Sequence, residues 1–361
     1  MGAWALRWTV AALAALSLTL ASAASGVRQA QRGASRPGAD ERLGGRTDVR
    51  AFADEVAARR GWHKSWVLQQ LRDARRLPRV QQLIMPPPAG TAKNWAAYRE
   101  RFVEPRRITA GMAFWQAHHD ALRRAEAQYG VPPEIVAGIL GVETYYGRIT
   151  GGFRVVDALA TLAFDFPSGR SDRSAFFRSE LEELLVLARR ERVRADSFRG
   201  SYAGAIGWPQ FMPGSVNRHA VDFDGDGHID LQHNVTDAIG SVARYLQRHG
   251  WQSGLPTHYP VQPPADEAER SLLLAPDILP SFSAAQFTER GAVLTPQGQA
   301  HAGPLALVRL ENGPAEPSWI AGTQNFYAIT RYNWSSYYAL AVIELGRAVK
   351  DAAGARINPP P

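Results

Sequence analysis

Residues 135–147, IVAGILGVETYYG, are the most informative stretch of the chain, because they place one acid at the end of an apolar run. From Ile135 to Val142 the run holds only apolar residues and glycines, a pattern typical of a buried helix. Burial disfavours the charged form of a carboxyl group and so raises its pKa. A general acid that cleaves a glycosidic bond needs such a raised pKa near neutral pH. Glu143 is therefore a candidate catalytic acid. The alternative of a solvated surface glutamate stays open, since most glutamates are exposed.

Helical periodicity extends over most of the chain on both sides of this run. From about Asp48 onward, apolar residues recur at helical spacing, and the first helical stretch stops at Pro86-Pro87-Pro88. Asn94 is expected to cap the next helix, Gly130 to end a long one, and Pro132-Pro133 to open the apolar helix. Other helices are predicted over residues 110–129, 175–190, 238–248 and 334–349.

The pattern changes between Leu255 and Trp319. Prolines cluster in the first ten residues of this stretch, and the apolar run Leu305 to Leu310 follows Gly303-Pro304, which predicts a strand after a turn. We therefore predict a mainly α (α+β) fold in which a small β-containing segment is inserted into a helical protein.

Composition supports a folded globular protein. The 361 residues are 45% hydrophobic and 21% charged, which excludes a disordered, collagen-like or membrane-spanning chain. There is no cysteine, so disulfides, thiolate zinc sites, cysteine nucleophiles and lipidation through cysteine are excluded. The formal charge is +7 without a long basic run. Such an excess favours anionic polymers, cell wall or lipid head groups, over nucleic acid, while a merely solvated surface is the default.

The N-terminus has the form of a secretory signal. Arg7 precedes an uncharged, largely apolar run from Trp8 to Leu20, which is shorter than the roughly 20 residues of a spanning helix. Ala21-Ser22-Ala23 then supplies a cleavage site, although an uncleaved anchor is the alternative. We expect export from the cytoplasm, to the periplasm in a bacterial host, with residues 24–48 as a flexible linker.

A segment from Ser201 to Pro213, SYAGAIGWPQFMP, combines small residues with aromatic and amide side chains. Small residues allow close approach of a ligand or of another helix, and aromatic faces stack on sugar rings. Ser201 and Gln210 offer a hydroxyl and an amide as hydrogen-bond partners. A sugar-binding wall and a tight helix–helix contact without ligand are both compatible with this segment.

An acidic loop begins at Asp222, with the sequence DFDGDGHID. Asp222, Asp224 and Asp226 stand at positions 1, 3 and 5 of an EF-hand-like calcium loop, and the His228 carbonyl stands at position 7. Position 12, normally glutamate, is His233, so Asp230 or Asp237 would have to supply the last carboxylate. We predict a structural Ca²⁺ site with ligands Asp222, Asp224, Asp226, His228 and Asp237. The alternative is an acidic turn without metal.

Taken together and in this order, these segments resemble the lytic murein transglycosylase B family. The resemblance rests on Glu143-Thr144-Tyr145-Tyr146-Gly147, the Ser201–Pro213 segment, the acidic loop, Asp237–Val242, and Tyr332-Asn333 with Tyr338-Ala339, and it spans about residues 50 to 350. It implies a lysozyme-like catalytic domain, with Glu143 as the single catalytic carboxylate. It also implies a sugar groove lined by Ser201, Gln210, Phe211, Asn333 and Tyr338.

The implied organisation has seven parts. They are a signal peptide (1–23), a linker (24–48), an N-terminal helical region (49–108), a lysozyme-like core with the acidic loop (109–254), a β-containing insertion (255–319), a C-terminal helix that completes the core (320–350) and a tail (351–361). Three departures from the family pattern stand out. This chain has no cysteine to lipidate and so resembles the soluble branch, the stretch after Asp230 is one residue longer, and Trp208-Pro209 replaces a smaller or tyrosine-type pair.

The implied activity is cleavage of peptidoglycan between N-acetylmuramic acid and N-acetylglucosamine, with formation of 1,6-anhydro ends. No organic cofactor is expected. Peptidoglycan strands are the expected partner, with other cell-wall enzymes as further partners, no nucleic acid and a monomeric state. Two other functions remain open from the sequence. One is a muramidase that uses water, and the other is a non-catalytic peptidoglycan-binding module.

Overall fold

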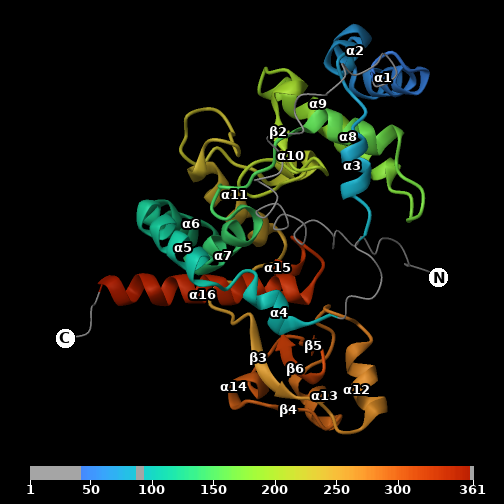
Figure 1. Cartoon of the computed structure of the whole chain (residues 1–361). Coiled ribbons are helices and arrows are strands. Elements are labelled where there is room, and N and C mark those ends of the chain that lie inside the picture. The colour runs from blue at the N-terminus through green and yellow to red at the C-terminus, as the bar shows by residue number, and fades with distance from the viewer. Residues whose placement is uncertain (1–41, 87–92, 358–361) are drawn as a thin grey trace, which may run out of the picture. The chain divides into compact units, whose positions relative to one another are not determined.

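The computed structural model describes residues 42–86 and 93–357, without the side chains of residues 355–357, and it is mainly helical (Figure 1). The described chain forms two compact units, each built from two separate stretches of sequence. The first unit holds residues 93–146 and 239–357, and the second holds residues 42–86 and 147–238. The predicted signal peptide lies outside the described residues. Within the described ranges, no helix combines the length and the apolarity needed to cross a membrane.

The two units cut across the predicted regions. Residues 49–108 are divided between them, and so are residues 109–254. Leu43 is buried and helix α1 begins at Thr47, so residues 42–48 fold with the helices that follow rather than continuing the linker. Helix α16 runs on to Ile357 and includes residues 351–357, which were predicted as tail.

The first unit is organised around helix α7, Pro133–Thr144, which is the predicted apolar helix. Every residue from Ile135 to Val142 is buried. Helix α7 packs against α16, Ser336–Ile357, and two glycines bring the backbones together. A Cβ at Gly138 would lie 2.2 Å from the Val342 carbonyl oxygen, and a Cβ at Gly346 would lie 2.0 Å from the Glu134 carbonyl oxygen. Any side chain at these two positions would separate the helices.

The pair packs against α4 Trp95–Glu100, α5 Pro105–Ala117, α6 His119–Tyr129 and α15 Gln324–Thr330 (Figure 1). The sheet of the insertion packs against α12 Glu267–Leu274, α13 Ala284–Glu289 and α14 Pro296–Gln299. The predicted long helix over residues 110–129 is two helices, because His118 leaves the helical conformation at φ −123° and ψ 22°. Apolar periodicity continues across this one-residue break, so the pattern could not reveal it.

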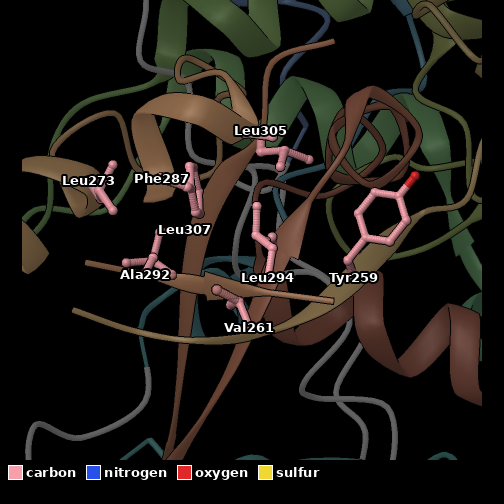
Figure 2. Packing of buried hydrophobic residues seen from close by; sticks show 10 residues of the cluster. Tyr259, Val261, Leu273, Phe287, Ala292, Leu294, Leu305 and Leu307 are labelled. Atoms are coloured by element: carbon pink, nitrogen blue, oxygen red, sulfur yellow. The ribbon is translucent and has the colours of Figure 1, made fainter. Parts of the chain in front are cut away.

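The β-containing insertion is confirmed and belongs to the first unit. Its strands are β3 His258–Gln262, β4 Val293–Leu294, β5 Ala306–Asn312 and β6 Ala315–Gly322, in the antiparallel order β4-β3-β6-β5. Phe287, Leu273 and Leu305 are fully buried beside the sheet, together with Leu307 and Tyr259 (Figure 2). The insertion therefore has a hydrophobic core of its own.

The regular elements of the second unit are helices apart from one short antiparallel pair, β1 with β2. Its central helix α8 is buried from Val155 to Ala163 and packs against α9. The elements are α1 Thr47–Arg60, α2 Lys64–Leu71, α3 Pro78–Leu83, β1 Phe153–Arg154, α8 Val155–Phe164, α9 Ser174–Arg190, a 3-10 turn Ala195–Ser197, β2 Arg199–Gly200 and α10 Pro213–His219. Helix α11, Val235–Arg248, begins in this unit and ends in the first.

Replacing Gly346 by alanine is expected to lower the free energy of unfolding, because the new Cβ has no room beside the Glu134 carbonyl oxygen. Overpacking costs about 1–3 kcal/mol, against the roughly 1 kcal/mol by which alanine exceeds glycine as a helix former. Gly354, in the same helix, has open space where a Cβ would stand, with no neighbouring atom within 4 Å, so Gly354→Ala is the matched control. Urea unfolding compares the two variants, and equal stability would contradict this helix contact.

Candidate active site and acidic loop

Glu143 lies in the last turn of α7, and its side chain is half-buried. Burial raises the pKa of its carboxyl group to about 7, against an ordinary value of 4.5. The Tyr338 hydroxyl donates a hydrogen bond of 2.6 Å to Oε1, which favours the ionised form and opposes part of that rise. Near neutral pH the carboxyl group is therefore divided between its protonated and ionised forms.

Tyrosines surround this carboxyl group within the first unit. Tyr338, from α16, is fully buried, and its ring stacks with that of Tyr332 at a centroid distance of 6.4 Å. Burial, with a further contribution from the negative charge of Glu143, raises the pKa of Tyr338, Tyr332 and Tyr98. All three hydroxyl groups stay protonated at physiological pH, so Tyr338 remains a hydrogen-bond donor.

No second carboxylate acts on Glu143 among the described residues of the first unit. The pKa of Glu143 is set by burial and by the Tyr338 hydrogen bond, with no contribution from another charged group. A retaining glycosidase places its two carboxyl groups about 5–5.5 Å apart, and such a neighbour would perturb the pKa strongly. Glu143 therefore has no carboxylate partner within the described part of the first unit.

The turn after Glu143 is strained, and Arg107 contacts both the turn and the end of α7. Tyr145 and Tyr146 both have left-handed backbone conformations, with φ of 52° and 56°. Arg107, on α5, donates through Nη1 to the Gly141 carbonyl oxygen at 2.6 Å, and its guanidinium lies 4.6 Å from the centre of the Tyr145 ring. Because Arg107 is 4% exposed, this contact is made inside the protein. The guanidinium fixes both the end of α7 and the first tyrosine of the turn.

Arg107 was not predicted from the sequence. A signal was nevertheless present, because Arg107 occupies the same helical face as Ala110, Gly111 and Phe114, at spacings of three, four and seven residues. A cation at a core position is rare unless it has a specific partner. Here the partners are a helix-end carbonyl and aromatic rings rather than a carboxylate.

Asn333 and Tyr338 are the predicted sugar-binding residues of the first unit. Tyr338 contacts Glu143 directly. Asn333 is 7% exposed, and its Oδ1 is buried without a hydrogen-bond partner in the described structure. Burying an amide oxygen without a partner is costly, so such an atom indicates a group that binds there from outside the protein or a water molecule.

The other three predicted sugar-binding residues, Ser201, Gln210 and Phe211, belong to the second unit. The Ser201 hydroxyl accepts from the backbone N–H groups of Ala203 and Ala205. Gln210 has φ of 51° and donates through Nε2 to the carbonyl oxygens of Gly207 and Thr150. Phe211 is 2% exposed, so its ring is part of the protein core. Its role in lining the sugar groove stays a prediction.

The acidic loop brings three of its predicted ligands together. Carboxylate oxygens of Asp222, Asp224 and Asp237 all lie within 4.8 Å of one another. Asp237 belongs to this group, whereas the Asp230 carboxylate accepts from the His233 N–H and lies outside it. The Asp226 carboxylate accepts from the backbone N–H of His228 and lies outside this group of three. The His228 ring nitrogen Nδ1 lies 3.6 Å from the Glu191 carboxylate. The predicted ligand at this position is the backbone carbonyl oxygen of His228, not its ring.

The three carboxylates fit a hard cation such as Ca²⁺, which prefers oxygen ligands. Asp237 is buried, which raises its pKa, and the negative charge of Asp224 adds to the rise. Desolvation acts in the same direction on Asp222, but backbone N–H groups of Gly227, Gly225 and Asp226 outweigh it and hold the pKa of Asp222 below its ordinary value. None of the three forms an ion pair with a described residue, so their mutual repulsion has no protein counter-charge.

The loop and the Gly-rich segment are joined inside the second unit. The backbone N–H of Trp208 donates to the Leu231 carbonyl oxygen at 2.8 Å. Gly207 has φ of 69°, and a Cβ there would lie 2.0 Å from the same carbonyl oxygen. The end of the acidic loop therefore supports the segment that carries Gln210.

The raised pKa of Glu143 makes stability depend on pH. Because the folded-state pKa lies above the unfolded one, the free energy of unfolding falls as pH rises from about 4.5 to about 7. Glu143→Gln removes the ionisation and should be more stable than the wild type at pH 8, by about 2 kcal/mol, and nearly equal at pH 4.5. Urea unfolding at both pH values measures this, and a stability difference that is the same at both would show that the carboxyl group is not desolvated.

Comparison with known proteins identifies the family. Residues 44–347 match the family model described as Transglycosylase SLT domain. The chain is 40% identical over 311 residues to membrane-bound lytic murein transglycosylase B of Escherichia coli K12, which covers 84% of this chain and 82% of that protein.

Solved structures agree with this match. Soluble lytic transglycosylase SltB1 from Pseudomonas aeruginosa has a TM-score of 0.77 at 40% identity, over 85% of this chain and 99% of that one. Escherichia coli lytic transglycosylase Slt35, solved in complex with calcium, has a TM-score of 0.73 at 38% identity, over 86% and 95% of the two chains. The predicted lysozyme-like fold and the predicted enzyme class are confirmed. The chain belongs to the Transglycosylase SLT domain family.

Proposed function

We propose that this enzyme is a lytic transglycosylase that cleaves the β-1,4 bond between N-acetylmuramic acid and N-acetylglucosamine in peptidoglycan. The observation that carries the proposal is the isolated Glu143 carboxyl group, with a pKa near 7 and a single hydrogen bond from Tyr338. Its relatives named as lytic murein transglycosylases support the substrate class.

In the first step Glu143 acts as general acid. Its protonated carboxyl group donates the proton to the glycosidic oxygen while the bond from that oxygen to C1 of the muramic residue breaks. The N-acetyl carbonyl oxygen of the same residue bonds to C1 and carries the positive charge as an oxazolinium ring. Tyr338 stabilises the glutamate carboxylate left behind, because its hydroxyl donates to Oε1.

In the second step the same residue acts as general base. The Glu143 carboxylate takes the proton of the C6 hydroxyl, and the C6 oxygen attacks C1 as the bond from the N-acetyl oxygen breaks. The product is a 1,6-anhydro sugar, and Glu143 regains its proton without consumption of water. A pKa near neutrality suits both roles, because neither direction of transfer is strongly uphill.

Glycan binding is proposed for residues of both units. Asn333 supports this role through its buried and unpartnered Oδ1. Ser201 and Gln210 are held by backbone hydrogen bonds, which would limit the entropy lost when they bind sugar. Phe211, whose ring is buried, completes this set.

Two further properties belong to the proposal. Residues Asp222, Asp224, Asp226 and Asp237, with the His228 carbonyl, would hold a structural Ca²⁺, as the relative solved with calcium suggests. The sequence of residues 1–23 supports a periplasmic location. The proposal also includes a monomeric state and other cell-wall enzymes as further partners.

The products of purified sacculi test the reaction. The wild type is expected to release muropeptides with 1,6-anhydromuramic ends, which lack one water relative to hydrolysis products in a mass spectrum. Glu143→Gln should lose activity by about 10³-fold or more, because loss of general acid catalysis and of the later base are combined. The rate should also fall as pH rises above about 7, when the acid is ionised.

A matched variant separates the catalytic role from folding. Glu134→Gln lies on the same helix, and it removes only an exposed pair with Lys350, so it should retain activity. Reducing ends in place of anhydro ends would indicate the muramidase alternative. A fully active Glu143→Gln enzyme would remove Glu143 from the mechanism.

Calcium should raise the melting temperature of the wild type. At 100 times the dissociation constant, binding to the native state adds about 2.7 kcal/mol. Asp237→Asn is expected to abolish this shift, whereas Asp230→Asn should retain it, because the Asp230 carboxylate lies outside the group of three. Thermal unfolding with calcium and with a chelator measures both variants. A wild-type melting temperature that calcium leaves unchanged would contradict the metal site.

A further inference from the structure

A surface hollow of about 850 Å³ lies against helices α1 and α2 in the second unit. Its wall is formed within residues 44–72 and includes Arg50, His63, Lys64, Trp66 and Arg72. None of the residues assigned above to catalysis, sugar binding or the metal lines it. We refer to it as the basic hollow.

The surrounding sequence concentrates the positive charge of the chain. Residues 42–86 carry ten Lys and Arg against four Asp and Glu, a formal charge of +6, while the whole chain carries +7. Half of these basic residues lie in helices α1 to α3, and the others lie before α1 or between α2 and α3, so the sequence contains no long basic run (Figure 1).

Some of these cations have acidic partners elsewhere in the unit. Arg59 and Arg60 both bind the Glu182 carboxylate, and Arg46 binds Asp165. In the described part of the unit, the cations that line the basic hollow have no such acidic partners from distant segments. Arg50 is exposed and forms no ion pair with a described residue.

Lys64 and Arg72 pair only with local, partly exposed acids, Asp54 and Asp73. Exposed pairs of this kind contribute about 0–1 kcal/mol, so an incoming carboxylate can replace them at little cost. The basic hollow therefore presents three cations that are available to an anionic ligand.

An aromatic ring lies beside these cations. Trp66 is half-buried in the wall, where the ring of Trp62 meets it edge to face at a centroid distance of 5.2 Å. Arg189 lies 5.3 Å from the centre of the Trp66 ring and helps to hold it in place. Ser65 and Gln69 add polar groups to the same wall. A fixed indole among hydroxyl and amide groups suits a sugar ring.

We propose that the basic hollow is a second binding site for peptidoglycan, remote in sequence from Glu143, which takes the carboxylate-bearing stem peptide together with an adjoining sugar. The inference rests on the proposed function for the substrate class. Peptidoglycan offers carboxylates and sugar rings on one polymer, and this wall offers cations and an indole. A concave wall with an aromatic ring favours such a polymer over the flat surface of an anionic membrane. Its effect would be to retain the enzyme on a glycan strand between cleavage events.

Charge reversal in full-length protein tests the site. The Arg50→Glu/Lys64→Glu/Arg72→Glu variant changes two arginines and one lysine, all at the surface. The control Arg123→Glu/Lys350→Glu/Arg248→Glu makes the same change in net charge at exposed positions of the first unit, and Lys350 is salt-bridged to Glu134 as Lys64 is to Asp54. Both triples are made in Glu143→Gln protein, so that sacculi stay intact during sedimentation binding.

The basic-hollow triple is expected to bind sacculi about tenfold more weakly than its parent, while the control changes less than twofold. Blocking the carboxyl groups of the sacculi with a carbodiimide and a neutral amine should remove the difference. In protein with Glu143 intact, the basic-hollow triple should digest sacculi more slowly yet cleave a short soluble muropeptide at an unchanged rate. Circular dichroism confirms that each variant is folded.

Three results would overturn the proposal. They are equal binding of the two triples to sacculi, a difference that survives carboxyl blocking, and an equal or larger effect of the basic-hollow triple on binding to vesicles that contain phosphatidylglycerol. The binding assay does not depend on catalysis. If wild-type protein failed to cleave sacculi while the basic hollow still bound them, the proposed function would fail and the second site would stand.

Discussion

The contact between helices α7 and α16 is the constraint on which the candidate active site depends. Gly138 and Gly346 allow the two backbones to touch, and at that spacing the Tyr338 hydroxyl reaches the Glu143 carboxyl group. An apolar helix with a carboxyl group at its end has no other means, in the described part of the first unit, of giving the ionised form a hydrogen bond. The absence of side chains at Gly138 and Gly346 thus permits both the helix contact and the hydrogen bond to Glu143.

Several features of the site lower the free energy of unfolding. Glu143 is desolvated, two successive tyrosines have left-handed conformations, and the Arg107 guanidinium is buried without a carboxylate partner among the described residues. Each costs free energy that the surrounding helices must supply. Their concentration within one helix end and its turn is typical of functional sites rather than of structural cores.

The sequence was most informative where one residue type could satisfy the pattern. The all-apolar run identified α7 and Glu143, because a helix buried on every side leaves no polar positions. The alternating aspartates identified the acidic loop, and the proline cluster located the insertion. The break at His118 was not predictable, since the apolar face continues across it. Residue type does not say which way a ring points, so the burial of Phe211 was not predictable, and its contact with sugar stays a prediction. Arg107 was missed because two of its partners, the Gly141 carbonyl oxygen and the Tyr145 ring, lie in a distant segment of the sequence.

The order of the segments has a consequence for how the enzyme matures. Glu143 leaves the ribosome about two hundred residues before Tyr338, and the two stretches of the first unit are separated in sequence by residues 147–238 of the second. The acid therefore has neither its hydrogen-bond donor nor its apolar cover until the final helix has been made. A nascent chain holds an ordinary solvated glutamate, and the reactive group comes into being only with completion of the fold.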